Sequence, residues 1–512
     1  MAEHMPSPGN RDEDPGVSFP EIDGRRSTSA TGKGVFADAA RVADEGLALQ
    51  IMQARDWRTD YLEYARRLLE ASLTTVHHPT SMSLAGLQSL HERFTFVRGG
   101  QEVALDAAVA LADDDAIVTT QVAGEGTAHD AELSVPYRGS RLRGDALHRQ
   151  LDAWLDSGIV EPSFAEAIRA VMANPDWLDL SDVTAAIMGA GAEMGPLHSL
   201  SRWGATVIPL DLPRPVLWSK ILSHVRQGRG RAIIPVAHPV DASAGDDEIA
   251  AVAGTNLLTQ WPEVATWLAG LDGPLLLGNY VYADGATHVR VSMAVDAVIH
   301  HLLERRGDLS LAVLATPTDV FAVPEETVEM SRRRSAGSRA PGLVRSAART
   351  ATRGRLFAPN YAELLATPDG LRLGIADCLV KQQGPNYALA KRLQRWRAAV
   401  ARERGVVTSI NVAPPTRTRS VMRNRVLAAA YAGAGAFGVE VFDPSTSNTL
   451  MAAMLVHDLR NTKSVAQPTI TLEHNHELFW HGAAHGGLWR NPYAARSVLG
   501  LAVVLGMVPR GA

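Results

Sequence analysis

The sequence contains a single cysteine, Cys378, in 512 residues. One thiol cannot form an internal disulfide framework, and a chain without such a framework suits a reducing compartment. No uncharged apolar run reaches the ~18 residues that a membrane-spanning helix needs, and the nearest one, 497–508, is too short. Residues 1–34 lack the apolar core of a secretory signal. We therefore expect a cytoplasmic protein without a transmembrane segment.

A strong charge imbalance is also absent, since the formal net charge is −5 at pH 7. So mild a charge argues against nucleic acid as an obligate partner. Arginine heavily outnumbers lysine and alanine is abundant, which indicates a bacterial source with a GC-rich genome. With 46% hydrophobic residues, a chain of this length can bury a large core and is expected to hold more than one domain.

Lysine is rare, yet one of the five lysines in the chain stands four residues after a tyrosine. Tyr387 and Lys391 belong to the run Gly-Pro-Asn-Tyr-Ala-Leu-Ala-Lys. This spacing puts both side chains on one face of a helix. An ammonium beside a phenol favours the phenolate and lowers the pKa of the tyrosine. Such a tyrosine can exchange a proton with a carbonyl or alcohol oxygen. The alternative is an accidental pair on a surface helix.

A glycine-rich turn lies far upstream of this pair. It follows the apolar strand expected at 183–188 and precedes a helix expected at 197–202. Its glycines are Gly189, Gly191 and Gly195. Glycines at such a turn let the backbone approach a pyrophosphate at the helix N-terminus. Asp211 ends the next strand about 20 residues beyond Gly189, where a carboxylate can hold the hydroxyls of the adenosine ribose. This segment predicts dinucleotide binding.

Together, the pair and the turn resemble the short-chain dehydrogenase/reductase superfamily, of which the chain looks like a divergent member with an N-terminal extension. The resemblance implies a Rossmann sheet that binds NAD or NADP, with the Tyr-x-x-x-Lys helix beside the nicotinamide. Four further strand regions of the family have counterparts in the expected order: 231–237, 274–285, 311–318 and 406–418.

The same resemblance implies roles for residues at the strand ends. Thr316 or Thr318 would replace the family's catalytic serine and polarise the substrate oxygen. Asn279 would support a proton-relay water. Lys391 would lower the pKa of the catalytic tyrosine and hold the nicotinamide ribose. Thr416, in the loop that folds over the nicotinamide in this family, would contact the cofactor.

The chain also departs from the family pattern. Its glycines read Gly-x-Gly-x-x-x-Gly rather than the common Gly-x-x-x-Gly-x-Gly, and Pro415 stands where a glycine is expected. The stretch between the fifth strand and the tyrosine helix is longer than usual. Within it, residues 332–355 contain eight arginines and no acidic residue. This basic segment is either a solvated linker or a lid that binds phosphate or carboxylate.

These features suggest three regions. Residues 1–34, rich in Pro, Gly, Ser and charge, are expected to be a disordered leader. Residues 35–180 form a mainly helical accessory region, which either caps the substrate cleft or makes a contact in a homo-oligomer. Residues 181–512 form the Rossmann catalytic domain, with the basic insertion at about 325–375.

The histidine-rich stretch 473–477, which is followed by His481 and His485, is a candidate metal site. Neutral histidines at such spacings can hold zinc. The stretch has no closed four-ligand pattern, however, so we expect no metal there and a polar loop near the mouth of the active site instead.

The sequence thus predicts an α/β protein with a Rossmann-like doubly wound parallel sheet and an extra N-terminal, mainly helical region. The expected activity is that of an NAD(P)-dependent oxidoreductase that interconverts an alcohol and a carbonyl on a small molecule. Apolar residues at Phe437, Val439 and 450–455 favour a large apolar substrate. Asp211 favours NAD over NADP, although Arg214 could accommodate a 2′-phosphate.

Two alternatives stay open at the level of the sequence. The first is a nucleotide-sugar epimerase or dehydratase of the extended branch, which uses the same Tyr–Lys pair to oxidise its substrate transiently. The second is a non-catalytic protein that binds a dinucleotide as a redox sensor or scaffold. The missing serine favours the second alternative, whereas the presence of the scarce lysine opposes it.

Overall fold

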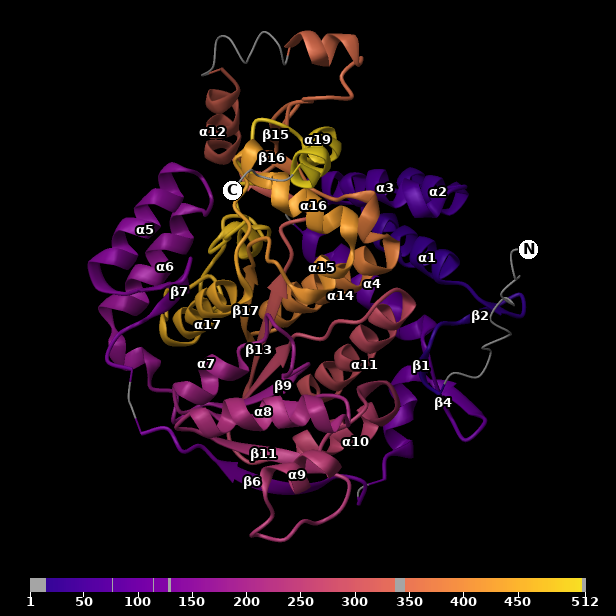
Figure 1. The fold of residues 1–512 in the computed structure, drawn as a ribbon. Coiled ribbons are helices and arrows are strands. Elements are labelled where there is room, and N and C mark those ends of the chain that lie inside the picture. The colour runs from indigo at the N-terminus through magenta and orange to yellow at the C-terminus, as the bar shows by residue number, and fades with distance from the viewer. Residues whose placement is uncertain (1–14, 76, 114, 128–129, 337–345, 509–512) are drawn as a thin grey trace, which may run out of the picture.

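A seven-stranded sheet forms the centre of the protein (Figure 1). The computed structural model describes residues 15–75, 77–113, 115–127, 130–336 and 346–508. The strands lie in the order β17-β13-β12-β9-β10-β11-β6, and all neighbours are parallel except β11 and β6. Their bounds are β6 Val118–Ala123, β9 Thr184–Met188, β10 Thr206–Leu210, β11 Arg231–Val236, β12 Leu275–Asn279, β13 Leu309–Ala315 and β17 Val407–Val412. The chain is a mixed α/β protein, compatible with a Rossmann-like fold.

The six parallel strands confirm the strands expected from the sequence. β10 and β12 are buried along their whole length, as their continuous apolar runs require. Successive side chains of β9 belong to two different cores: Ala185 and Ile187 to one, Ala186 and Met188 to the other. Since neighbouring residues of a strand point to opposite faces, apolar layers cover the sheet on both sides.

Helices supply these two layers. The core that holds Met188 includes α10 (Leu257–Ala269), α11 (Ala286–Leu303) and α14 (Pro385–Glu403). The core that holds Ile187 includes α7 (Leu197–Arg202), α8 (Pro215–Gln227), α9 (Asp246–Val252) and α17 (Pro444–Arg460). No helix within the described ranges is both long and apolar enough to cross a membrane.

The start of the described chain is regular. β1 (Gly16–Ser18) pairs with β4 (Thr95–Arg98), and the hairpin β2 (Glu21–Ile22) and β3 (Arg25–Arg26) follows. Ser27 caps the next helix by accepting a hydrogen bond from the N–H of Ala30. The expected disordered leader is therefore wrong for residues 15–34, because strand pairing and a helix cap order this segment. Residues 1–14 lie outside the described residues.

The accessory region expected at 35–180 packs directly on the central sheet and its helices. Its remaining elements are α1 Thr28–Arg41, α2 Glu45–Gln53, α3 Trp57–Ser72, α4 His78–Arg93, β5 Gln101–Ala104, η1 Leu105–Leu111, β7 Val135–Tyr137, β8 Ser140–Leu142, α5 Gly144–Asp156, α6 Pro162–Ala173 and η2 Pro175–Leu178. In Figure 1, α1–α4 lie to the right of the sheet and α5 and α6 to the left. α4 packs closely on α14, since a Cβ on Gly86 would lie 2.3 Å from the ring of Trp396. β6 even joins the central sheet, so residue 180 marks no boundary in it.

The long connection between β13 and α14 forms a small sheet in the order β14-β16-β15 and a helix. Its elements are β14 Val320–Pro324, α12 Glu325–Ala336, β15 Leu365–Ala366, β16 Arg372–Asp377 and η3 Lys381–Gln383. After β17 the chain adds α15 Arg419–Arg423, α16 Arg425–Gly433, η4 Ala434–Phe437, α18 Glu477–Trp480 and α19 Ala495–Met507. α16 and α19 lie against each other at the top of the molecule (Figure 1).

Candidate active site

A cavity of about 2070 Å³ lies along the carboxyl ends of the parallel strands. Gly189 follows β9, Asp211 follows β10, Asn279 ends β12 and Thr316 follows β13, and all four line it. The other site residues predicted from the sequence that line the same cavity are Gly191, Gly195, Thr318, Tyr387 and Lys391. The fold thus brings nearly all the predicted site residues to one place.

Thr416 is the exception. Its hydroxyl is buried, donates to the Pro414 carbonyl over 2.8 Å and shares a hydrogen bond of 2.6 Å with Ser447. It braces the loop after β17, whereas its neighbours Pro415 and Thr418 line the cavity. The prediction that Thr416 contacts a cofactor is not supported by this placement, because its polar atom already has partners away from the cavity.

Tyr387 lies in the first turn of α14, at the cavity wall. Its hydroxyl is hydrogen-bonded to the side chain of Thr316. Thr316 Oγ1 lies 2.9 Å from Thr318 Oγ1, which accepts a hydrogen bond of 2.8 Å from Gln383 Nε2. Thr316 and Thr318 therefore connect the phenol to a chain of hydrogen bonds.

The structure changes the expected electrostatics of this tyrosine. Burial raises the pKa of Tyr387 above its ordinary value, and the hydrogen bond from Thr316 offsets only part of this effect. The sequence-based expectation that the lysine lowers the pKa of Tyr387 is therefore wrong, because desolvation of the phenolate dominates. At neutral pH the phenol keeps its proton.

Lys391 points its ammonium along the wall towards the end of β13. Its Nζ donates to the Leu314 carbonyl over 3.3 Å and to Gln394 Oε1 over 2.9 Å. Gln394 in turn lies 3.4 Å from Asn279 Oδ1, so lysine and asparagine share one network. Burial lowers the pKa of Lys391 to about 8, with Asp319 opposing the shift. Holding the charged ammonium in the interior costs free energy, and the ammonium can donate at most three hydrogen bonds to offset that cost.

The glycine turn forms the other end of the cavity. Gly189 has a φ of +82°, and a Cβ there would lie 2.9 Å from the backbone of Tyr280. The N–H of Gly191 donates to Asp211 Oδ2 over 2.8 Å, while Leu212 N–H donates to Oδ1 over 2.8 Å. These two hydrogen bonds hold the Asp211 carboxylate beside the glycine turn. Burial nevertheless raises the pKa of Asp211, a sign that its carboxylate is short of partners.

Two further residues join the glycine turn to the loop after β17, and sequence reasoning missed both. Arg419 donates from its backbone N–H and its Nε to the Glu193 carboxylate, over 2.7 and 2.9 Å. Glu193 stands inside the glycine run, where an acidic residue is unusual. Its partner lies 226 residues away, so the spacing of residues in the sequence does not reveal the ion pair. This ion pair crosses the cavity margin between the two loops.

His288 was missed as well. Its ring lies 5.4 Å from the ring of Tyr387 and 5.1 Å from that of Tyr282, and it lines the cavity. Burial lowers the pKa of His288 to about 3, helped by the nearby charge of Lys391. Its Nε2 is buried without a hydrogen-bond partner. No sequence signal marks this histidine, since it is an isolated residue at the start of α11.

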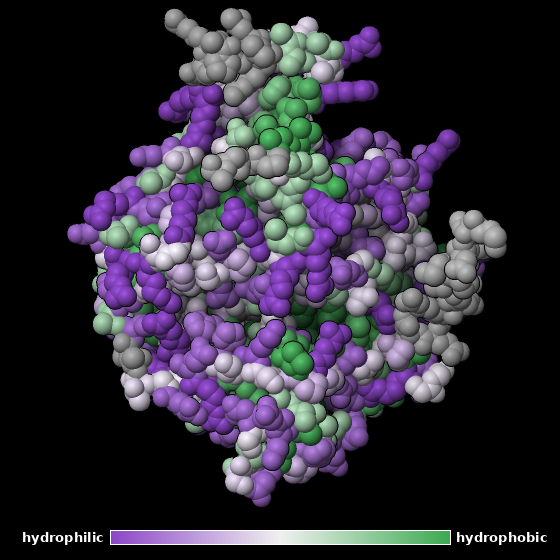
Figure 2. Space-filling view, viewed as in Figure 1, coloured by the Kyte–Doolittle hydropathy of each residue, from purple (hydrophilic) through white to green (hydrophobic). Residues whose placement is uncertain are grey.

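α16 and α19 cover one side of the cavity. Leu427, Tyr431 and Val498 are among the residues of these helices that line it. Figure 2 shows apolar surface gathered over these two helices. The exposed apolar side chains of this region are Met422, Val426, Val504, Leu505 and Met507. Phe437 and Val439, expected to mark an apolar substrate region, also line the cavity, whereas the side chains of 450–455 belong to the core around α17.

The basic segment does not reach the cavity with its described arginines. Arg333 pairs with Glu329 at 2.8 Å, and Arg334 donates to the Asp156 carbonyl over 3.1 Å. Among the described residues of 332–355, none lines the cavity. This placement favours the reading as a solvated segment over the reading as a lid, while residues 337–345 lie outside the described residues.

The histidine-rich stretch has structural contacts. The rings of His474 and His476 stack at 5.2 Å, and His476 Nε2 lies 2.9 Å from Ser72 Oγ. His485 Nε2 lies 2.8 Å from Glu161 Oε1, a carboxylate that also pairs with Arg490. None of these histidines lines the cavity, so the expected polar loop at its mouth is wrong; the stretch ties the C-terminal region to N-terminal helices.

Comparisons with known proteins add no family to this description. No protein-family model, no curated protein and no solved structure matches the chain.

Proposed function

We propose that the chain is an NAD(P)-dependent oxidoreductase that interconverts an alcohol and a carbonyl. The strand order supports this. Numbered along the chain from β9, the six parallel strands lie in the order 3-2-1-4-5-6 of dinucleotide-binding folds. Together with the helices on both faces, this order supports the doubly wound arrangement that we propose. Ligands of such sheets bind at the carboxyl ends of the strands, where the order reverses, here between β9 and β12.

One observation carries the proposal: a single cavity joins the glycine turn and Asp211 to the Tyr387–Thr316 hydrogen bond. Its volume of about 2070 Å³ exceeds the ~300–1,000 Å³ typical of a pocket for one drug-sized ligand. A dinucleotide and a second molecule can therefore occupy it together. The glycine turn and Asp211 would hold the adenosine half, and the tyrosine end would receive the substrate.

The residues present fit a nicotinamide cofactor. A Cβ on Gly191 would lie 2.4 Å from Leu217 Cδ1 and 3.2 Å from Asp211 Oδ2, so the turn has no room for a side chain of its own. At the other end, the unpartnered Nε2 of His288 is a buried polar atom that a ligand group would satisfy. The cofactor supplies hydride transfer, and the chain supplies the proton and the orientation.

The protein's part in the reaction follows from the phenol. Because burial raises its pKa, Tyr387 is protonated at neutral pH and serves as a proton donor to a carbonyl oxygen. Thr316, hydrogen-bonded to it, orients the hydroxyl, and the chain through Thr318 to Gln383 leads away from the reacting atoms.

A cofactor titration followed by absorbance at 340 nm with a panel of ketones and alcohols tests the proposal. Consumption of NADH or NADPH with a ketone is the expected result. Binding without turnover of any substrate would favour the dinucleotide sensor. Turnover of a nucleotide sugar without net change at 340 nm would favour the epimerase or dehydratase. Failure to bind either dinucleotide would overturn the proposal.

Asp211→Ala should change the choice between the two cofactors. The Asp211 carboxylate at the end of β10 repels a 2′-phosphate and accepts hydrogen bonds from free ribose hydroxyls, so the wild type should prefer NAD. Removing it should shift the ratio of the two dissociation constants toward NADP by about 10-fold, equivalent to about 1.4 kcal/mol. Arg214 and Lys220, which also line the cavity, would then be free to attract the phosphate.

Isothermal titration of NAD and NADP into both proteins measures this ratio. Asp284→Ala is the matched control, because Asp284 is another carboxylate at the cavity wall, hydrogen-bonded to Tyr282 instead of the glycine turn. It should leave the ratio unchanged. Tighter binding of NADP than NAD by the wild type would contradict the assignment of Asp211.

A further inference from the structure

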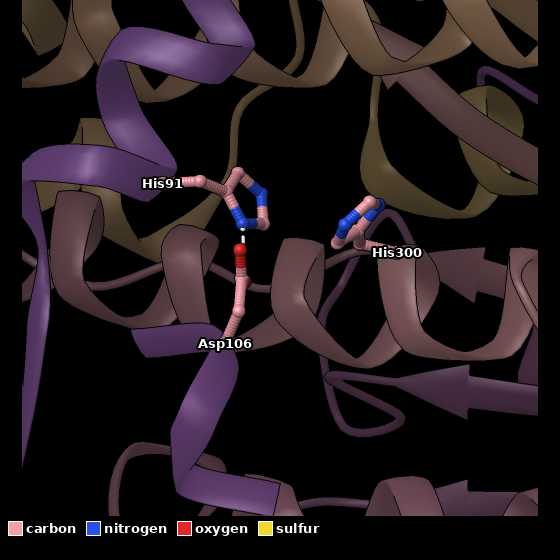
Figure 3. Close-up of side chains that lie close together, drawn as sticks. All are labelled: His91, Asp106 and His300. Atoms are coloured by element: carbon pink, nitrogen blue, oxygen red, sulfur yellow. Dashed lines mark hydrogen bonds and ion pairs between the residues drawn. The ribbon is translucent and has the colours of Figure 1, made fainter. Parts of the chain in front are cut away.

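A second group of chemically capable side chains lies apart from the cavity (Figure 3). It consists of His91 near the end of α4, Asp106 in η1 and His300 near the end of α11. His91 Nδ1 lies 2.7 Å from Asp106 Oδ1, and the ligand atoms of the three residues lie within 4.8 Å of one another. Two imidazoles and one carboxylate are a common set of protein ligands for zinc.

The second ring nitrogen of His91, Nε2, has the kind of hydrogen-bond partner that metal-binding histidines have. Its Nε2 lies 2.8 Å from Asp296 Oδ2, and this buried carboxylate also accepts hydrogen bonds of 2.8 and 2.7 Å from Arg397. Metal-binding histidines almost always donate their second ring N–H to a carboxylate, carbonyl or water. With the proton on Nε2, the lone pair of His91 Nδ1 faces Asp106, an arrangement that is unfavourable unless a cation or a second proton lies between them.

His300 supplies an independent observation. Its Nδ1 is buried and has no hydrogen-bond partner in the structure. The ring lies 4.9 Å from that of His91, and in Figure 3 it stands to the right of His91 while Asp106 lies below. A buried polar atom without a partner is costly, and native proteins contain few of them. A shared ion would give this nitrogen a partner.

We propose that His91, Asp106 and His300 bind one divalent transition-metal ion of the zinc type, with water as the fourth ligand. Tetrahedral nitrogen and oxygen ligands at 2.0–2.2 Å from zinc are roughly 3.3–3.6 Å apart. The His91–Asp106 distance would therefore widen and His300 would move closer, shifts of about 1 Å. Asp106 is half exposed, so the ion can enter from solvent.

The site would have a structural role. None of its three ligands lines the large cavity, so the ion does not meet the proposed substrate. It would instead join two N-terminal elements, α4 and η1, to α11, a helix whose first turn carries His288 at the cavity.

The test uses full-length protein freed of metal by dialysis against a chelator, and zinc as the probe. Calorimetry should show uptake of one tightly bound equivalent, and zinc should raise the melting temperature. His300→Ala should weaken binding by at least the 10- to 100-fold that is typical even for supporting residues of metal sites. His301→Ala is the matched control, because His301 Nδ1 faces Arg305 instead, at 3.1 Å. It should bind zinc like the wild type.

Two results would overturn the proposal. In the first, the wild type takes up no zinc under these conditions. In the second, wild type and His300→Ala bind zinc equally well, which would place the ion at other histidines of a chain that has 17. Circular dichroism of each variant shows that it is folded, and Asp106→Asn, a nearly isosteric change at a half-exposed position, gives a second ligand deletion that should also weaken binding.

Discussion

Tyr387→Phe should lower kcat by about 10²-fold or more while the dissociation constant of the dinucleotide barely changes. The substitution removes the transferable proton and the hydrogen bond to Thr316 but keeps the ring that packs against His288. Because the loss affects the transition state more than substrate binding, kcat and kcat/KM should fall together. Steady-state rates at 340 nm and a cofactor titration measure the two effects separately.

Tyr431→Phe provides the matched control for this experiment. Tyr431 also lines the cavity, and burial raises its pKa to about 12, but it belongs to α16 and not to the hydrogen-bonded chain of Thr316 and Thr318. Its loss should leave kcat within a few-fold of the wild type. Equal kcat values for Tyr387→Phe and the wild type would remove the tyrosine from the mechanism.

Lys391→Met should make the protein more stable at neutral pH and at the same time damage turnover and cofactor binding. Burial lowers the pKa of Lys391 from 10.5 to about 8, which corresponds to at most about 3 kcal/mol of cost for holding the charge. Methionine fills a similar volume without a charge. The lost hydrogen bonds to Leu314 and Gln394 reduce this gain but should not reverse it.

The pH dependence has a definite sign. Between about pH 8 and 10.5 the unfolded chain binds more protons at this lysine than the folded one, so wild-type stability rises with pH in that window. The advantage of Lys391→Met should therefore be full below pH 8 and shrink as the pH approaches 10.5. Urea unfolding at pH 7 and 9.5 measures it, with the exposed Lys463→Met as control. A variant less stable than the wild type at pH 7 would contradict the prediction.

The sequence predicted those parts of the fold whose signals are local. The six parallel strands are runs of apolar residues, and the turn at Gly189 and the helix that carries Tyr387 follow from spacing alone. Residues at the carboxyl ends of neighbouring strands then had to meet at one edge of the sheet. The glycine-turn pattern points to Asp211 and the family resemblance to Asn279 and Thr316, and all three line the cavity.

Features set by distant contacts were beyond such reasoning. The pKa of Tyr387 depends on how much of the chain covers it, and spacing to Lys391 carries no information about that. The joining of β6 to the edge of the sheet, and the pairing of Glu193 with Arg419, each connect segments far apart in sequence. His288 has no neighbours that mark it, so only its position in the structure reveals it.

Under the proposed function, the contact between α16 and α19 would affect the size of the substrate independently of the chemistry. A Cβ on Gly433 would lie 2.0 Å from the Ala502 carbonyl, and one on Gly506 would lie 1.9 Å from that of Ala429. At these two glycines the helices meet backbone to backbone, without long side chains between them. We therefore expect α16 and α19 to move as one unit. Enlarging either glycine would tilt the two helices and alter the space beneath them, whereas Tyr387 lies on α14 and Thr316 follows β13. Under the proposed function, substitutions at this contact would change which substrates enter and leave the proton-transferring residues in place.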